Sequence, residues 1–196
     1  MNDFYHILRF LHVMSFVFMS IPLFNLIVVN ERAQIATVFD YYADRYFENV
    51  IRRGALRCFV FQGTALVTGL LLLAEGPLGI AALWGNGILL TKTLLLVTLT
   101  ALLSYVHFGL QPRIEALLAM VNPDSPVPDD FASQLKPFRV RRKRVATLCL
   151  FLVITTIILG LQVYSRFSAP LTLFLIGLAG LFAWRVNRTL LRFGWL

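Results

Sequence analysis

The sequence predicts an all-α protein that crosses a membrane as a bundle of five transmembrane helices, and three observations support this prediction. Hydrophobic residues make up 58% of the chain and charged residues 14%, whereas a soluble domain averages about 45–50% and about 25%. Five apolar stretches are each long enough to cross a bilayer as a helix. Lys and Arg residues lie mainly on one side of the predicted membrane, as the positive-inside rule describes.

The apolar stretches place the five spans, in chain order, at about residues 7–29, 56–74, 88–110, 145–164 and 169–186. Aromatic and charged residues alternate over residues 30–53, which is typical of an interfacial segment or, in a second interpretation, of a surface that docks a partner. The third span is expected to continue as a helix to Ala119. Residues 111–144 as a whole combine a Pro- and Asp-rich stretch with a basic cluster, so we expect a basic cytoplasmic loop there. Residues 1–196 thus form a single membrane domain.

The distribution of the 18 Lys and Arg residues predicts the orientation of the chain. Arg9, Lys92 and Arg166 fall on one side of the predicted membrane, and the other 15 of the 18 fall on the opposite side. Because basic residues favour the cytoplasmic side, we expect the N-terminus outside and the C-terminus in the cytoplasm. The net charge of +8 then reflects topology, and no nucleic-acid partner is expected.

Ionisable side chains inside the spans mark the candidate site, because such groups at membrane depth normally face a bundle interior or a polar cavity. The third span carries Lys92 near its outer end and His107 near its inner end, and the two lie on one side of the helix. The first span carries His12 near the outer surface. His12 and Lys92 therefore form an outer pair, whereas His107 lies about 22 Å from Lys92 along the helix.

Several kinds of site remain open for His12 and Lys92. His12 suits a single axial ligand of haem iron, with Lys92 near an anionic group such as a propionate. The same pair suits a quinone headgroup, a carboxylate on another helix, or ordinary hydrogen bonds between helices. His107 is a second candidate, or it caps the membrane interface beside Tyr105. The separation of His12 and His107 disfavours a haem clamped by both.

Other chemistries have little support in the sequence. It contains no His-x-x-His, Met-x-x-Met or Cys-x-x-Cys pattern, so the signal for a copper site is weak. Cys58 and Cys149 are far apart in the chain, and we interpret them as small apolar side chains of the spans. The glycine loops, nucleophile elbow and His-Glu-x-x-His motif of soluble enzymes do not occur.

Two motifs and the segment after them carry a family resemblance. The first span opens with Leu11-His12 followed by V-M-S-F-V-F-M, and a later span reads K-T-L-L-L-V-T-L-T-A-L-L-S-Y-V-H, from Lys92 to His107. A basic segment and a further span follow, reading F-R-V-R-R-K-R-V-A-T-L-C-L-F-L-V. This arrangement resembles a superfamily of small membrane bundles that includes the bacterial CopD proteins and the HemJ-type protoporphyrinogen oxidases. The resemblance covers roughly residues 5–165 and leaves the fifth span as an addition to a four-span core. The Asn-Glu-x-Pro of HemJ-type proteins has no counterpart before the fourth span.

The resemblance implies a haem b protein in the cytoplasmic (inner) membrane of a bacterium, with His12 as the haem ligand and Lys92 in the same pocket. The chain would then serve electron transfer or, at most, act as a haem-dependent membrane oxidoreductase. The alternative is a cofactor-free accessory or structural subunit of a larger respiratory or photosynthetic membrane complex. Expected partners are membrane lipid and either other membrane subunits or further copies of the chain.

Overall fold

The structure is a computed structural model that describes residues 2–35, 39–121, 127–128, 130–163 and 165–188. These residues contain five helices that are long and apolar enough to cross a membrane, which confirms the predicted fold class. The helical elements, in chain order, are α1 (Asn2–Ile35), α2 (Tyr41–Glu75), the short α3 (Ala82–Gly85), α4 (Gly87–Ser104), η1 (Tyr105–Leu110), α5 (Gln111–Ala119), α6 (Phe131–Leu161) and α7 (Ala169–Arg188).

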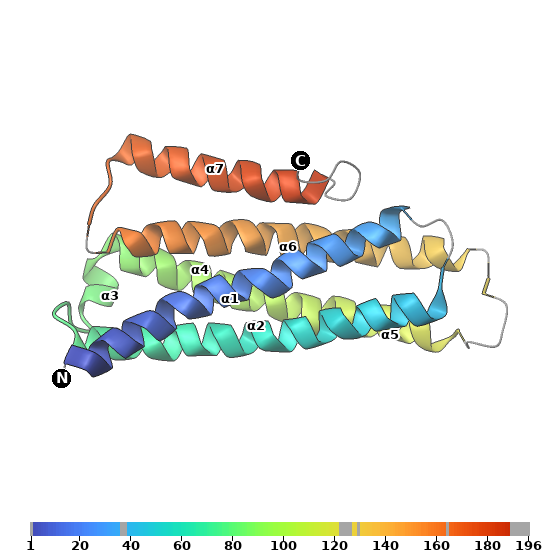
Figure 1. Ribbon diagram of the computed structural model, residues 1–196, viewed down its shortest axis with the longest axis horizontal. Coiled ribbons are helices and arrows are strands. Elements are labelled where there is room, and N and C mark those ends of the chain that lie inside the picture. The colour runs from blue at the N-terminus through green and yellow to red at the C-terminus, as the bar shows by residue number, and fades with distance from the viewer. Residues whose placement is uncertain (1, 36–38, 122–126, 129, 164, 189–196) are drawn as a thin grey trace.

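Four long rods form the centre of the bundle, and α7 lies outside them (Figure 1). The rods are α1, α2, α6 and the continuous run of α4, η1 and α5. Helix α7 packs mainly on α6 and covers only the part of the bundle nearer the chain's N-terminus (Figure 1). We call that part the N-terminal end, and the opposite part, where α5 lies and α6 begins, the basic end.

Local sequence explains where the helices begin and end. Asp40 caps α2, since its side chain accepts a hydrogen bond from the Ala43 amide at 3.1 Å. Asn86 caps α4 in the same way, accepting from the Ile88 amide at 3.0 Å. Helix α2 stops before Gly76 and Pro77, because proline cannot continue the helical hydrogen bonding.

Two apolar clusters make up the interior. The larger one lies in the spans and includes Met19, Leu99 and Val153, all at most 1% exposed. The smaller one lies at the basic end and includes Ile114 and Leu135. In the most apolar windows of the five spans only 17% to 33% of residues are buried, so most of their apolar surface faces outward, as expected for contact with lipid.

The helices reach further than the predicted spans. Within residues 30–53 the described part of the chain forms the end of α1 and the start of α2, and residues 36–38 lie outside it. That this segment lies at the membrane interface stays a prediction. Within residues 111–144, α5 and the first part of α6 are helical, and α5 does end at Ala119. Residues 122–126 and 129 of the expected loop lie outside the described part of the chain. The helices extend beyond the predicted spans because the side chains of the smaller apolar cluster pack these helix ends against one another.

The wide turn η1 changes which residues of the third span face inward. The Gln111 amide bonds the carbonyl of Val106, five residues back, in place of the usual four. Pro112 follows directly, and it has no amide hydrogen to give to a carbonyl of the preceding turn. The extra residue in the turn lets Leu110 and Gln111 both lie buried in the bundle.

Candidate functional site

His12 extends from α1 to the backbone of α2. Its ring Nδ1 lies 3.0 Å from the carbonyl oxygen of Ala65 and 3.1 Å from the Thr68 hydroxyl. Because a carbonyl oxygen only accepts hydrogen bonds, Nδ1 must carry the proton and donate it. This leaves Nε2 with a free lone pair, and Nε2 has no hydrogen-bond partner among the described residues.

A glycine on α2 makes room for the His12 ring. A Cβ atom built on Gly69 would lie 3.0 Å from Cε1 of His12, which is closer than real Cβ contacts normally come. The edge of the Phe16 ring packs on the imidazole, with the ring centroids 5.4 Å apart. The imidazole is therefore held between α1 and α2 in one orientation.

Lys92 lies at the same end of the bundle as His12. Its Nζ sits 3.3 Å from the place where a Cβ of Gly160 would be, so the side chain bridges from α4 to α6 over a glycine. Within the described residues the ammonium group forms no ion pair or hydrogen bond, so the pair combines one free imidazole nitrogen with one unpaired cation.

His107 lies apart from this pair. It belongs to η1 and packs edge-on against Phe59 of α2 and against Phe108, with ring centroids 5.7 Å and 4.8 Å away. Phe59 and the His12 partner Thr68 are separated along α2 by about 13 Å. Nδ1 of His107 is buried and has no partner in the described part of the chain. His12 and His107 thus do not share a site.

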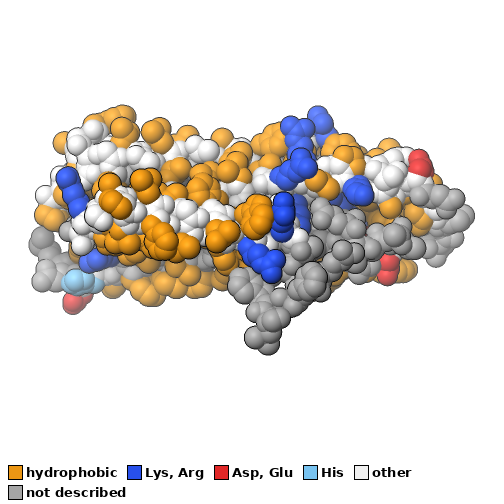
Figure 2. Space-filling model, turned by 90° about the horizontal axis from the view of Figure 1, so that it is seen from above, with side chains coloured by type: hydrophobic (Ala, Val, Ile, Leu, Met, Phe, Trp, Pro, Cys, Tyr) orange, Lys and Arg blue, Asp and Glu red, His pale blue; other side chains and the backbone are white. Residues whose placement is uncertain are grey.

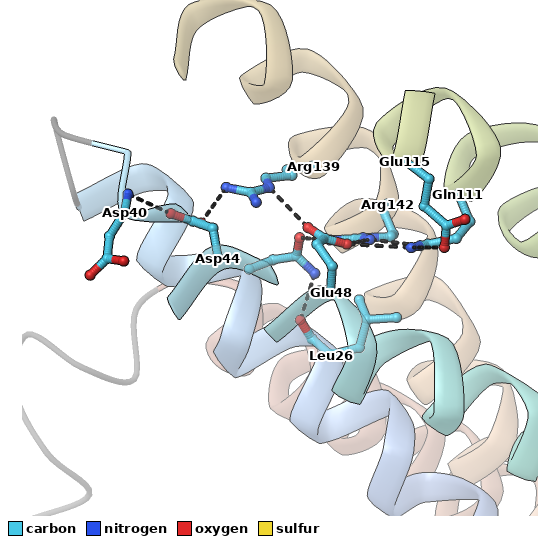
Figure 3. Close-up of polar contacts among 9 residues, drawn as sticks. Leu26, Asp40, Asp44, Glu48, Gln111, Glu115, Arg139 and Arg142 are labelled. Atoms are coloured by element: carbon cyan, nitrogen blue, oxygen red, sulfur yellow. Dashed lines mark hydrogen bonds and ion pairs between the residues drawn. The ribbon is translucent and has the colours of Figure 1, made fainter. Parts of the chain in front are cut away.

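The structure also contains a buried charged cluster that sequence reasoning missed. It joins all four central rods at the basic end (Figure 3). Its members are Asn30 of α1, Asp44 and Glu48 of α2, Gln111 of α5, and Arg139 and Arg142 of α6, each at most 7% exposed.

Glu48 lies at the centre of the charged cluster. It accepts hydrogen bonds from Nε of Arg139 at 3.1 Å and from both terminal nitrogens of Arg142. Arg142 also donates to Gln111 at 2.8 Å and to Asn30 at 2.9 Å, and Arg139 donates to Asp44 at 2.9 Å. The two acids and two arginines balance in charge, as a buried group of this kind requires.

Beside the cluster is a small hollow with room for about one water molecule. It is lined by every member of the cluster except Gln111, and by Val29, Phe47 and Ile51. Nε of the fully buried Arg142 has no partner among the described residues. A buried donor without a partner is costly, and Arg142 is one of the residues that line this hollow.

A sequence signal for the charged cluster did exist. Asp44 and Glu48 are four residues apart, and Arg139 and Arg142 are three apart, so each pair lies on one side of its helix. The two pairs were assigned to an interfacial segment and a loop, where charged residues are expected to face water. Only the helical continuation past the spans turns them inward.

The two cysteines lie in apolar surroundings. Cys58 and Cys149 are free thiols buried in the larger apolar cluster, in keeping with their interpretation as apolar side chains. No group of three or more His, Cys, Asp or Glu side chains suited to a metal ion occurs in the described ranges. A haem iron held by a single imidazole does not need such a group.

Comparison with known proteins finds no matching family model and no significantly similar curated protein or solved structure, so the resemblance to the CopD and HemJ-type proteins stays a prediction.

Proposed function

We propose that this membrane protein binds a redox-active group, haem b, at the N-terminal end of the bundle and serves electron transfer or a haem-dependent oxidation. The observation that supports it best is the hydrogen bond from Nδ1 of His12 to the Ala65 carbonyl. Metal-binding histidines usually donate their other ring nitrogen to a carbonyl or carboxylate, which fixes the ring and strengthens the ligand nitrogen. Nε2 of His12 is then the ligand atom.

Lys92 supports the same proposal through its charge. An ammonium group inside a bundle is stabilised by an anionic neighbour, and the propionate groups of haem b would supply one. His12 would hold the iron and Lys92 a propionate, and the bound haem would supply a one-electron redox centre. The donor set of one imidazole and one ammonium group fits this cofactor.

The first test is a dithionite-reduced minus oxidised absorption spectrum of the protein purified in mild detergent, with a pyridine haemochromogen assay. We expect a b-type haem at about one per chain, lost in His12→Ala and retained in His107→Ala, because His107 lies elsewhere in the bundle. A haem spectrum that survives in His12→Ala would disprove the ligand assignment. A folded wild-type preparation without haem would disprove the haem proposal itself.

A second candidate function is that of a cofactor-free accessory subunit in a larger membrane complex. Helix α7 favours it, because its outward face exposes Leu173 (70%) and Phe174 (61%). Gly177 of the same helix has no atom within 4 Å of its Cβ position, so another backbone can approach there.

This candidate predicts a colourless preparation that retains another membrane protein in a fixed ratio. Gly177→Leu should release that protein, whereas Gly63→Leu on α2, where the space is equally open, should not. Equal retention in both variants would rule out α7 as the contact.

A further inference from the structure

The basic end carries more exposed cations than its acids can balance. Asp44 and Glu48 are buried and paired with Arg139 and Arg142. Besides Arg113 of α5, seven exposed arginines lie where the basic end meets the part of the bundle covered by α7, and we call these seven the arginine belt: Arg52, Arg53 and Arg57 of α2, Arg141 and Arg144 of α6, and Arg185 and Arg188 of α7. Figure 2 shows part of this belt as a band of basic side chains next to the apolar surface.

Contacts between the helices place the belt at one level of the bundle. The bonds of Glu48 with Arg139 and Arg142 bring Arg52 of α2 next to the start of the apolar part of α6. The hydroxyl of Thr147 donates to Asn187 at 3.2 Å, which sets the end of α7 beside the same part of α6. The belt therefore lies on the side of the bundle formed by α2, α6 and α7, where their apolar spans meet the basic end.

Few acids neutralise the belt. Arg52 lies 3.9 Å from Glu115, and the other six belt arginines form no ion pair within the described ranges. The guanidinium of Arg141 rests on the Tyr105 ring, 5.3 Å from its centroid, and that of Arg188 rests on Trp184 at 4.5 Å. Arginines in this position carry the planar group that forms bidentate hydrogen bonds with phosphate.

We propose that the arginine belt binds the headgroups of anionic phospholipids in the leaflet at the basic end. The charge is complementary, the position is that of lipid headgroups, and the aromatic rings orient two of the arginines. Basic residues at a membrane surface attract acidic lipids by about 1 kcal/mol each, which corresponds to about fivefold in affinity per residue. The proposal does not depend on whether the protein binds haem.

The test is native mass spectrometry of the full chain in detergent, with equal amounts of phosphatidylglycerol and phosphatidylcholine of the same acyl chains. The wild type should prefer phosphatidylglycerol. The preference should fall about fivefold in Arg144→Gln and vanish in a variant with Arg141, Arg144, Arg185 and Arg188 all changed to Gln. Because these side chains are exposed, the temperature of unfolding should stay unchanged in Arg144→Gln and should fall only slightly in the fourfold variant, which loses the ring contacts of Arg141 and Arg188.

Arg166→Gln is the matched control, since Arg166 is exposed at the N-terminal end of the bundle. It should leave the lipid preference as in the wild type. Equal binding of both lipids by the wild type would overturn the proposal. So would a preference that survives the fourfold variant, or one that falls equally in Arg166→Gln and Arg144→Gln, because net charge alone would then explain it.

Discussion

Among single side chains, Glu48 is the acid with the most partners in the charged cluster. It accepts hydrogen bonds from Arg139, Arg142 and Gln111 while only 4% exposed. Changing Glu48 to Gln removes the negative charge and leaves two arginines buried without it. We expect a loss of about 3–5 kcal/mol of stability, the usual result of breaking a buried ion pair from one side.

Denaturant unfolding in detergent, followed by circular dichroism, measures the effect of Glu48→Gln. Glu75→Gln makes the same change at an exposed position at the other end of α2 and should leave the free energy of unfolding within about 0.5 kcal/mol. Equal losses in the two variants would mean that the charged cluster contributes no particular stability.

A second residue-scale prediction concerns the glycine beside His12. Gly69→Ala places a methyl group 3.0 Å from the imidazole Cε1, so the ring must shift and its bond to Ala65 should weaken. We expect lower haem content, measured by the haemochromogen assay, together with reduced stability. Gly63→Ala, on the same helix with open space around it, should retain full haem content and gain about 0.5–1 kcal/mol. Identical haem content in the two variants would contradict a role for this space.

At the scale of elements, α7 is attached to the bundle through small side chains. Ala179 and Ala183 are buried on the side of α7 that faces α6, at 4% and 3% exposed. Ala183→Leu should overpack this contact and cost about 1–3 kcal/mol, measured as a lower unfolding midpoint. Ala74→Leu adds the same volume at an exposed position of α2 and should have little effect. A midpoint unchanged by Ala183→Leu would show that α7 is only loosely attached.

The sequence predicted the helices well within the membrane spans, where hydropathy identifies them, and less well where the helices continue outside the spans. The apolar stretches predicted five spans, because the need to satisfy backbone groups in lipid leaves helices as the solution. Hydropathy does not report how far a helix continues into water, so the basic-end helices around Ile114 and Leu135 were not expected as a packed unit. The wide turn at η1 was not predicted either, because the expectation was a continuous helix to Ala119.

For the candidate site, too, the sequence predicted positions along the spans but not the contacts between helices. Spacing along the spans predicted that His12 and Lys92 share one end and that His107 lies elsewhere, and the structure places them so. The partners of His12 on α2, Ala65 and Thr68, depend on how two helices rotate against each other. That rotation is set by the packing of the whole bundle, so it cannot be predicted from the spacing and hydropathy of one sequence.

At the scale of the whole molecule, the distribution of Lys and Arg predicts that the basic end faces the cytoplasm. A fluorescent protein fused to the C-terminus should therefore be bright, since it matures in the cytoplasm, and an alkaline phosphatase fusion at the same place should be inactive. The reverse pattern would contradict the predicted orientation, and it would move the arginine belt to the outer leaflet.

The charged cluster also sets an order of events during synthesis. Glu48 and its partner Arg142 are 94 residues apart in the chain, and ribosomes add about 5–20 residues per second. For roughly 5–20 seconds the new chain thus holds Asp44 and Glu48 without their arginines, and these acids must stay hydrated at the edge of the bilayer. Closure of the cluster therefore occurs only after α6 has emerged, so a chain that stops short of Arg139 keeps an open, water-exposed end that proteases can attack.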